Sequence, residues 1–228
     1  MFLPLDKTLV IAEAGINHDG DLDAAIQLID AAVAADADYV KFQSFVAEEL
    51  VLPIAERSTY IVEGSHEGES FRDLLKRLEL DRAGQRQLSD YCKSKGIKFL
   101  STAFDLQSLD YLCDEIGCDV IKVASADLTN LRFLRHCGTK NVPVILSTGM
   151  ADLPEIDEAL QTLQDAGTKE ICILHCVSWY PSPPEIINLR AMHTLRDRYG
   201  LPVGYSDHSL GTTLPAAAVA MGARCIEK

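Results

Sequence analysis

Residues 142–178 read VPVILSTGMADLPEIDEALQTLQDAGTKEICILHCVS, and this stretch decides the fold class. Two short apolar runs, Val142–Thr148 and Glu170–Ser178, are rich in aliphatic and β-branched residues, as expected of buried strands. Between them, Leu153–Ala166 carries apolar residues at helical spacing. A strand, a helix and a second strand in this order predict a βαβ unit of a parallel sheet.

The same alternation continues along the whole chain and predicts eight strands. They are Leu9–Gly15, Tyr39–Ser44, Lys98–Phe104, Val120–Ser125, Val142–Thr148, Glu170–Ser178, Pro202–Asp207 and Ala223–Lys228. Helical stretches lie between them, the clearest being Leu22–Asp36, Leu153–Ala166 and Asn188–Tyr199. An open doubly wound sheet usually stops at about five or six strands. Eight strands therefore favour a closed (β/α)8 barrel, the TIM barrel.

Two further expectations concern the end of the barrel and its longest connection. We expect residues 1–228 to form one TIM-barrel catalytic domain that is truncated after strand 8, since a complete barrel typically has about 250 residues. The long connection Phe45–Ser70 follows the second strand and contains Pro53, Gly64 and Gly68. A long segment on the catalytic face of a barrel predicts a lid.

Composition excludes several classes of partner. The 34 acidic and 21 basic residues give a formal charge of -13, which repels nucleic acid and anionic membranes. The 7 cysteines are scattered without a Cys-x-x-Cys pair, as expected of reduced thiols in a cytoplasmic protein. No segment reaches the roughly 18 apolar residues of a membrane span. An anionic substrate must therefore meet a local cluster of cations.

Two lysines inside apolar strands predict such a cluster. Lys41 lies in YVKFQ and Lys122 in VIKVA, and a buried ammonium is costly unless it is paired. The pair indicates an anion site, although each lysine can instead pair with a nearby carboxylate. Hydroxyl groups at strand ends can add donors to a phosphate or a carboxylate, or can cap helices. These hydroxyls belong to Ser101, Thr102, Ser125, Ser147 and Ser206.

Other polar residues at strand ends allow more than one interpretation. His208 can bind a metal as a neutral imidazole, or can simply hydrogen-bond within its loop. Glu13 precedes a turn that is either a sugar-binding corner or a helix entry. Tyr180 lies in a proline-rich loop that either covers a sugar or braces the next helix. His175 and Cys176, inside the sixth predicted strand, are expected to pack in the core.

Several motifs together resemble the N-acetylneuraminate (sialic acid) synthase family, whose relatives make legionaminic and pseudaminic acids. They are IAEAGINHDG (residues 11–20), VKFQ (40–43), STGM (147–150), HCVSWYP (175–181), GYSDH (204–208) and IEK (226–228). They occur in the family's order, and the match spans the whole chain. The resemblance implies a cytoplasmic transferase that condenses phosphoenolpyruvate with an N-acylated amino-sugar aldehyde of the N-acetylmannosamine type. The product would be a nine-carbon 2-keto sugar acid, and phosphate would be released.

The resemblance also implies roles for individual residues. Phosphoenolpyruvate would be held by Lys41, Thr102, Lys122, Ser125, Ser147 and Ser206, with Ser178 nearby, while Glu13, Gln43 and Tyr180 would face the sugar. Glu13, Asp127 and Lys41 would be catalytic, the two carboxylates by moving protons. Asp127 stands where many members have glutamate, so its reach is shorter. His208 matches one of two histidine ligands of a divalent metal, manganese or magnesium.

The resemblance further concerns the end of the chain and the assembly. The family continues from Glu-Lys into a second histidine ligand, and later into a small antifreeze-like domain that completes a partner subunit's site. We expect the final helix and that domain to be absent here. A homodimer is expected for the full-length protein.

Two other functions fit the strand ends taken alone. A lyase can use Lys41 or Lys122 as a Schiff-base nucleophile, although the serine-rich anion site argues against this chemistry. A non-catalytic barrel that binds a sugar or a phosphate can keep the same strand ends without the metal.

Overall fold

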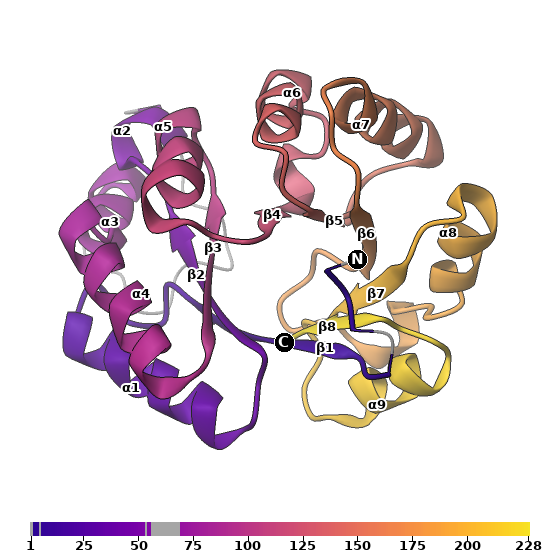
Figure 1. The fold of residues 1–228 in the computed structure, drawn as a ribbon, viewed down its shortest axis with the longest axis horizontal. Coiled ribbons are helices and arrows are strands. Elements are labelled where there is room, and N and C mark those ends of the chain that lie inside the picture. The colour runs from indigo at the N-terminus through magenta and orange to yellow at the C-terminus, as the bar shows by residue number, and fades with distance from the viewer. Residues whose placement is uncertain (1, 5, 53, 56–68) are drawn as a thin grey trace. The chain divides into compact units, whose positions relative to one another are not determined.

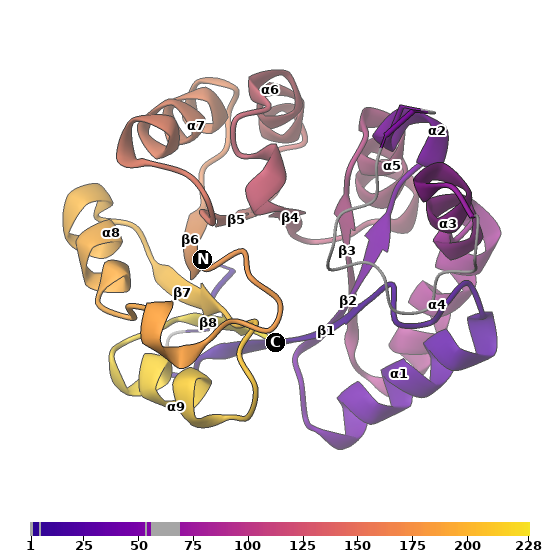
Figure 2. The same cartoon turned by 180° about the vertical axis from the view of Figure 1, so that it is seen from behind.

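Strands and helices alternate along the chain in the computed structural model, which describes residues 2–4, 6–52, 54–55 and 69–228 (Figures 1 and 2). Eight strands follow one another in sequence order, β1 to β8, which is the order of a closed barrel. The TIM-barrel prediction is therefore confirmed. Two compact units make up the chain: the first unit is Glu13–Cys118, and the second unit combines Met1–Ala12 with Asp119–Lys228.

All eight predicted strands are present, and several are shorter than predicted. They are β1 (Leu9–Gly15), β2 (Tyr39–Ser44), β3 (Lys98–Ala103), β4 (Ile121–Val123), β5 (Val144–Ser147), β6 (Ile171–Cys176), β7 (Val203–Ser206) and β8 (Cys225–Glu227). The fourth ends early because Ser125–Asp127 forms a 3-10 turn, η2, in which the amide of Asp127 donates to the carbonyl of Ala124. The residues after the strands are therefore loops that carry polar side chains.

Helices lie between the strands. They are α1 (Leu22–Ala34), α2 (Ala47–Leu50), α3 (Phe71–Leu78), α4 (Arg82–Lys95), α5 (Leu106–Asp110), the π-helical η1 (Tyr111–Ile116), α6 (Leu131–Thr139), α7 (Leu153–Asp165), the 3-10 turn η3 (Pro184–Ile186), α8 (Ala191–Tyr199) and α9 (Thr213–Ala220). Local chemistry explains where α7 begins. Asp152 and Glu155 form a reciprocal capping box there, so the first amides of the helix have partners.

In the first unit, strand register separates two faces of the parallel pair β2–β3. Lys41 lies opposite Leu100 and Gln43 opposite Thr102, so Lys41, Gln43 and Thr102 share one face. Ser44 and Ser101 lie on the other face. The loop and helices after β2 pack on an apolar cluster of Phe45, Ala47, Leu74, Leu75 and Leu78. The predicted lid falls largely on residues 53 and 56–68, which lie outside the described residues.

In the second unit, β4 to β8 pair in order, and the first residues of β1 pair with β8. Gly204 in β7 permits a close approach, because a Cβ atom there would lie 2.2 Å from the carbonyl oxygen of Cys225 in β8. Large side chains such as Ile145 and Tyr205 are completely buried in this unit. The strands therefore form a rigid support for the loops that follow them.

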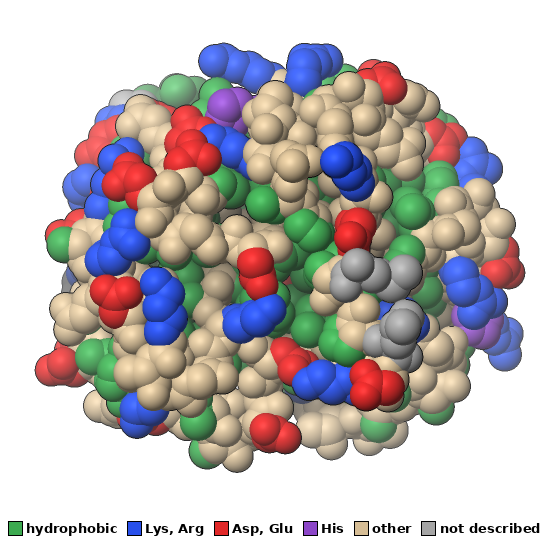
Figure 3. Space-filling model, viewed as in Figure 1, with side chains coloured by type: hydrophobic (Ala, Val, Ile, Leu, Met, Phe, Trp, Pro, Cys, Tyr) green, Lys and Arg blue, Asp and Glu red, His purple; other side chains and the backbone are tan. Residues whose placement is uncertain are grey.

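The surface carries charges of both signs (Figure 3), and the cysteines form no disulfide. On the face drawn in Figure 3, acidic and basic side chains are interspersed, without one large basic area. The seven cysteines are thiols, and only Cys113 among them is partly exposed. No helix in the described part of the chain is long and apolar enough to cross a membrane.

Candidate active site

Lys41 is the centre of a polar cluster in the first unit. Its side chain is buried in β2, where its ammonium forms an ion pair with the carboxylate of Glu13 and donates to Thr102 Oγ1 at 3.1 Å. The paired lysine that the sequence allowed as an alternative is therefore present. An ammonium beside a carboxylate can hold an anion and can also assist proton transfer.

Gly15 shows how close the sugar-facing candidates lie to one another. Its φ is +53°, and a Cβ atom there would lie 3.0 Å from Glu13 Oε1 and 3.7 Å from Gln43 Nε2. Glu13 and Gln43 thus direct a carboxylate and an amide toward the same point. We call Glu13, Lys41, Gln43 and Thr102 the first cluster.

Ser101, predicted as a further donor near the lysine, belongs to a different network. Its hydroxyl lies 2.7 Å from that of Ser44, which donates to Gln85 Oε1 of α4 at 2.8 Å. Because Ser101 and Thr102 are neighbours in a strand, they point to opposite faces. The prediction was wrong for Ser101, whose hydroxyl ties the strands to the covering helix.

Lys122 is the centre of the corresponding cluster in the second unit. Its side chain, 3% exposed, donates to Ser147 Oγ at 2.8 Å and to the carbonyl of Val123 at 3.1 Å. Its ammonium also lies 3.6 Å from Glu227 Oε2, which accepts from Ser206 Oγ at 2.7 Å. Glu227 was not predicted as a site residue. A carboxylate inside the short apolar strand at the end of the chain was the signal for it.

Three more side chains converge on the glycine that follows Ser147 and Thr148. The amide of Gly149 donates to Ser125 Oγ at 2.9 Å. A Cβ atom on Gly149 would lie 2.4 Å from Ser178 Oγ, 2.9 Å from Ser125 Oγ and 3.3 Å from Cys176 Sγ. We call Lys122, Ser125, Ser147, Cys176, Ser178, Ser206 and Glu227 the second cluster. It brings together five of the predicted phosphoenolpyruvate residues.

Asp127 lies on η2 with a shielded carboxylate. Its Oδ1 accepts from the Asn130 side chain at 3.3 Å, whereas Oδ2 is shielded from solvent and has no hydrogen-bond partner among the described residues. Burial raises the pKa of Asp127 above its ordinary value, and the bond from Asn130 opposes this only in part. Asn130, not Asp127, caps α6 by accepting from the amide of Phe133. A carboxyl group with a raised pKa suits general acid or base chemistry.

His208 follows β7, and its hydrogen bond leaves Nε2 as the ring nitrogen that can bind a metal. Its Nδ1 lies 2.8 Å from the carbonyl of Val177, which can only accept, so Nδ1 carries the proton and Nε2 keeps its lone pair. Burial lowers the pKa of His208, which favours the neutral ring. The ring of Tyr180 lies 4.0 Å from it, centroid to centroid. His208 therefore fits one ligand position, and Tyr180 lies beside it.

Asp207 stabilises the loop that carries His208. This buried carboxylate accepts from Tyr205 at 2.8 Å, from the amide of Ser209 at 2.9 Å and from Lys228 at 2.7 Å. Within the described ranges, no group of three or more His, Cys, Asp or Glu side chains is arranged to hold a metal ion. The imidazole of His208 is thus a candidate ligand on a loop that these hydrogen bonds hold in place.

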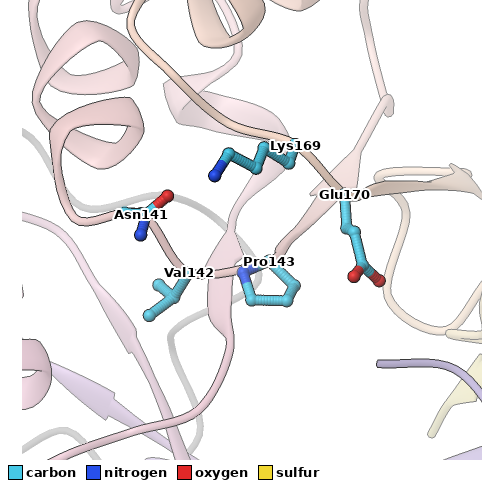
Figure 4. A pocket seen from close by; sticks show the side chains of 5 residues that line it. All are labelled: Asn141, Val142, Pro143, Lys169 and Glu170. Atoms are coloured by element: carbon cyan, nitrogen blue, oxygen red, sulfur yellow. The ribbon is translucent and has the colours of Figure 1, made fainter. Parts of the chain in front are cut away.

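A pocket elsewhere in the second unit does not compete with these clusters. It is lined by Asn141, Val142, Pro143, Lys169 and Glu170 (Figure 4). These residues precede β5 and β6, so the pocket lies at the N-terminal ends of the strands. Active sites of this fold lie at the opposite, C-terminal ends.

Comparison with known proteins gives the family. The family model described as NeuB matches residues 28–228. The chain belongs to the NeuB family. It is 45% identical over 226 residues to an N,N'-diacetyllegionaminic acid synthase of Campylobacter jejuni, covering 98% of this chain and 67% of that protein. It is 32% identical over 220 residues to the N-acetylneuraminate-9-phosphate synthase of Homo sapiens, covering 96% of this chain and 60% of that protein.

A solved structure supports the same conclusion. The crystal structure of an N-acetylneuraminic acid (sialic acid) synthetase from Leptospira borgpetersenii superposes with a TM-score of 0.85 at 36% identity. The match covers 98% of this chain and 73% of that one. The predicted family and barrel are thus confirmed for this NeuB-family chain, which spans about three fifths to two thirds of the two curated relatives.

Proposed function

We propose that this NeuB-family barrel condenses phosphoenolpyruvate with an N-acylated amino-sugar aldehyde and releases phosphate, giving a nine-carbon 2-keto sugar acid. The second cluster carries the proposal. It offers one ammonium, from Lys122, and four serine hydroxyls, two of them close to Gly149, which is the chemistry that phosphate and carboxylate groups require. The names of the two curated relatives described above, both synthases, support the reaction class.

The proposed reaction forms one carbon–carbon bond and breaks one carbon–oxygen bond. C3 of phosphoenolpyruvate attacks the aldehyde carbon, and positive charge develops at C2. Water adds at C2, and the tetrahedral intermediate loses phosphate through cleavage of its C2–O bond. Lys41 and Lys122 hold the anionic groups throughout, which contributes positioning and electrostatic stabilisation.

Protons must move three times in this sequence, the last time from the new C2 hydroxyl to the departing phosphate. The aldehyde oxygen gains one when the new bond forms, and the attacking water loses one. Asp127, whose raised pKa keeps more of it protonated, suits the first transfer, and Glu13 beside Lys41 suits the second. A divalent ion, manganese or magnesium, bound in part by Nε2 of His208, would polarise the aldehyde.

The first cluster and the relatives support the sugar class that we propose. Glu13 and Gln43 offer an acceptor and an amide for hydroxyl and acylamino groups, and Tyr180 offers an aromatic face. N-acetylmannosamine is the first candidate aldehyde. The identity of 45% to the diacetyllegionaminic acid synthase, against 32% to the N-acetylneuraminate-9-phosphate synthase, supports a diacetamido sugar as the second candidate.

Phosphate release tests the proposal directly. We expect the full-length protein to release phosphate from phosphoenolpyruvate only when an acylamino sugar and manganese or magnesium are both present. Substrate binding without phosphate release would instead support a non-catalytic barrel. A covalent adduct on Lys41 or Lys122, trapped by borohydride, would establish the Schiff-base alternative.

We also propose that residues 1–228 act as the catalytic barrel domain of a longer polypeptide that forms a homodimer. The greater length of the relatives supports a further domain. Exposed apolar side chains in the loops of the second unit support an interface, and their contribution can be measured.

A further inference from the structure

Lys228 follows β8, and its ammonium binds the residues on both sides of His208. Its Nζ donates to Asp207 Oδ2 at 2.7 Å and to the carbonyl oxygen of Ser209 at 2.6 Å. Asp207 and Ser209 are the residues immediately before and after His208. One side chain from the end of β8 thus holds both neighbours of the candidate metal ligand.

The backbone of Lys228 is held as well. Its amide donates to the carbonyl of Ile11 in β1 at 3.0 Å, and the amide of Asp207 donates to the carbonyl of Glu227 at 2.8 Å. These bonds continue the parallel pairing of β8 with β1 and with β7 by one residue. The ammonium of Lys228 therefore reaches the His208 loop from a backbone that is bonded to the neighbouring strand.

A second pair of side chains joins the same two strand ends. Ser206 and Glu227 are register partners between β7 and β8, and Ser206 donates to Glu227 Oε2 at 2.7 Å. This pair belongs to the second cluster. Because successive residues of a strand face opposite sides, the pair that follows, Asp207 and Lys228, faces away from that cluster. The ends of β7 and β8 are thus joined once within the second cluster and once at the loop that carries the imidazole.

We propose that Lys228 is a positioning residue for a divalent metal, because it fixes the backbone on both sides of His208. The inference rests on the proposed function, in which Nε2 of His208 binds that metal. Nδ1 of the same ring donates to the carbonyl of Val177 at 2.8 Å, so the ring is also held at its other edge. Groups that orient a ligand raise the metal affinity of the site. Lys228 therefore acts on the metal only through His208.

Charge must be separated from position in any test, because Lys228 also compensates the carboxylate of Asp207, whose side chain is completely buried. We call Lys228→Met together with Asp207→Asn the neutral pair. It removes one charge of each sign, so the net charge beside the metal site does not change. The asparagine keeps an oxygen that can accept from the amide of Ser209 and the hydroxyl of Tyr205, as the carboxylate does. The neutral pair therefore removes chiefly the bonds of the ammonium.

Manganese binding to the full-length protein, measured by electron paramagnetic resonance without substrates, tests the role. We expect the neutral pair to weaken manganese binding about tenfold, as the loss of a group that orients a ligand does. Lys228→Arg, which keeps a cationic donor, should recover part of the loss. Unchanged affinity in the neutral pair would overturn the inference. An unchanged affinity in His208→Ala would also overturn it, because the metal would then bind elsewhere.

Arg198 and Asp157 provide the matched control. They form an ion pair in the same unit, between α8 and α7, and both side chains are partly exposed. Arg198→Met together with Asp157→Asn also removes one charge of each sign, and it should leave the manganese affinity unchanged. Equal losses of affinity in the two double variants would mean that the loss of an ion pair, not positioning, is the cause.

Metal binding without substrates separates this inference from the proposed function. Weaker manganese binding by the neutral pair would support the positioning role even if no sugar were turned over. Equal affinities in wild type and the neutral pair, with phosphate release by the wild type, would overturn the role and leave the proposed function intact. If the neutral pair does not fold, Lys228→Met alone decides. Its uncompensated carboxylate can only attract a cation, so weaker manganese binding would support positioning, whereas equal or tighter binding would overturn it.

Discussion

Asp127 is a residue whose proposed role in catalysis conflicts with stability. Its pKa is raised in the folded state by burial, so the unfolded chain ionises at lower pH than the native one. The stability that this carboxyl group contributes is complete below its ordinary pKa and is lost as pH rises through the raised value. At neutral pH the carboxylate therefore opposes folding.

We predict that Asp127→Asn raises the melting temperature at neutral pH, and that the gain shrinks as the pH falls to about 4. The same variant should release phosphate poorly, whereas Asp127→Glu should remain active. Thermal melts between about pH 4 and pH 8, with parallel phosphate assays, measure both effects. A difference in melting temperature that does not depend on pH, or normal turnover by the asparagine variant, would remove Asp127 from the proposed chemistry.

A substitution at Gly149 is expected to weaken substrate binding without preventing folding. A methyl group there would meet the hydroxyls of Ser178 at 2.4 Å and Ser125 at 2.9 Å, and both can rotate away. We predict that Gly149→Ala retains its fold and weakens phosphoenolpyruvate binding at least tenfold, because the displaced hydroxyls lose their hydrogen bonds. Calorimetry and circular dichroism measure the two properties. Normal affinity would mean that these hydroxyls do not contact the substrate.

The buried ion pair of Lys122 and Glu227 is expected to affect both the affinity for phosphoenolpyruvate and the stability of the fold. We predict that Lys122→Ala destabilises the protein by about 3–5 kcal/mol, because it removes the cation beside a buried carboxylate. Lys122→Met combined with Glu227→Gln should recover much of that stability but not the affinity for phosphoenolpyruvate. Urea denaturation and calorimetry on both variants give the comparison. Recovery of affinity in the double variant would show that the ammonium does not hold the substrate.

At the level of elements, the contact between β7 and β8 depends on the absence of a side chain at Gly204. A methyl group on Gly204 would lie 2.2 Å from a backbone carbonyl oxygen of β8 and 2.6 Å from Leu174 Cδ2, and the backbone cannot rotate away. We predict that Gly204→Ala destabilises the protein by about 1–3 kcal/mol or more, as overpacking does. Urea denaturation measures the loss, and left-handed backbone strain cannot cause it, because Gly204 has no positive φ. An unchanged free energy of unfolding would contradict the steric explanation.

Most of the elements could be predicted because their patterns are local. The run from Val144 to Ser147 and the repeat in Leu153–Asp165 are each readable without knowledge of their neighbours. The ends of the strands were less predictable, because a strand extends only as far as its hydrogen bonds to the neighbouring strand. The turn Ser125–Asp127 was therefore predicted in part as strand.

The candidate site was predictable to the extent that single residues carry a signal. A lysine in an apolar strand must have a partner, which identified Lys41 and Lys122. The carboxylate that each lysine contacts depends on tertiary packing and could not be predicted from the sequence. Register likewise decided between Ser101 and Thr102, because adjacent residues face opposite sides. Cys176 was expected to pack in the core, and only the structure shows that its sulfur lies close to Gly149, as the Ser125 hydroxyl does.

At the scale of the whole molecule, exposed apolar side chains support the proposed dimer. Trp179 and Leu210, in the loops after β6 and β7, are 61% and 83% exposed, and such groups commonly mark interaction sites. We predict that Trp179→Ser together with Leu210→Ser shifts the full-length protein from dimer toward monomer in sedimentation velocity. Val219→Ser, at an exposed position on α9, serves as the control. A dimer that resists the first pair of changes would place the interface elsewhere.

The pairing of Lys122 with Glu227 has a consequence for inhibitor design. A purely anionic inhibitor must compete with an internal carboxylate for the same ammonium, so part of its expected gain in affinity is lost. A zwitterionic ligand, such as a phosphonate with a neighbouring ammonium, can instead insert between the two side chains and satisfy both. Chemical libraries screened against this barrel should therefore include amino-phosphonates alongside simple analogues of phosphoenolpyruvate.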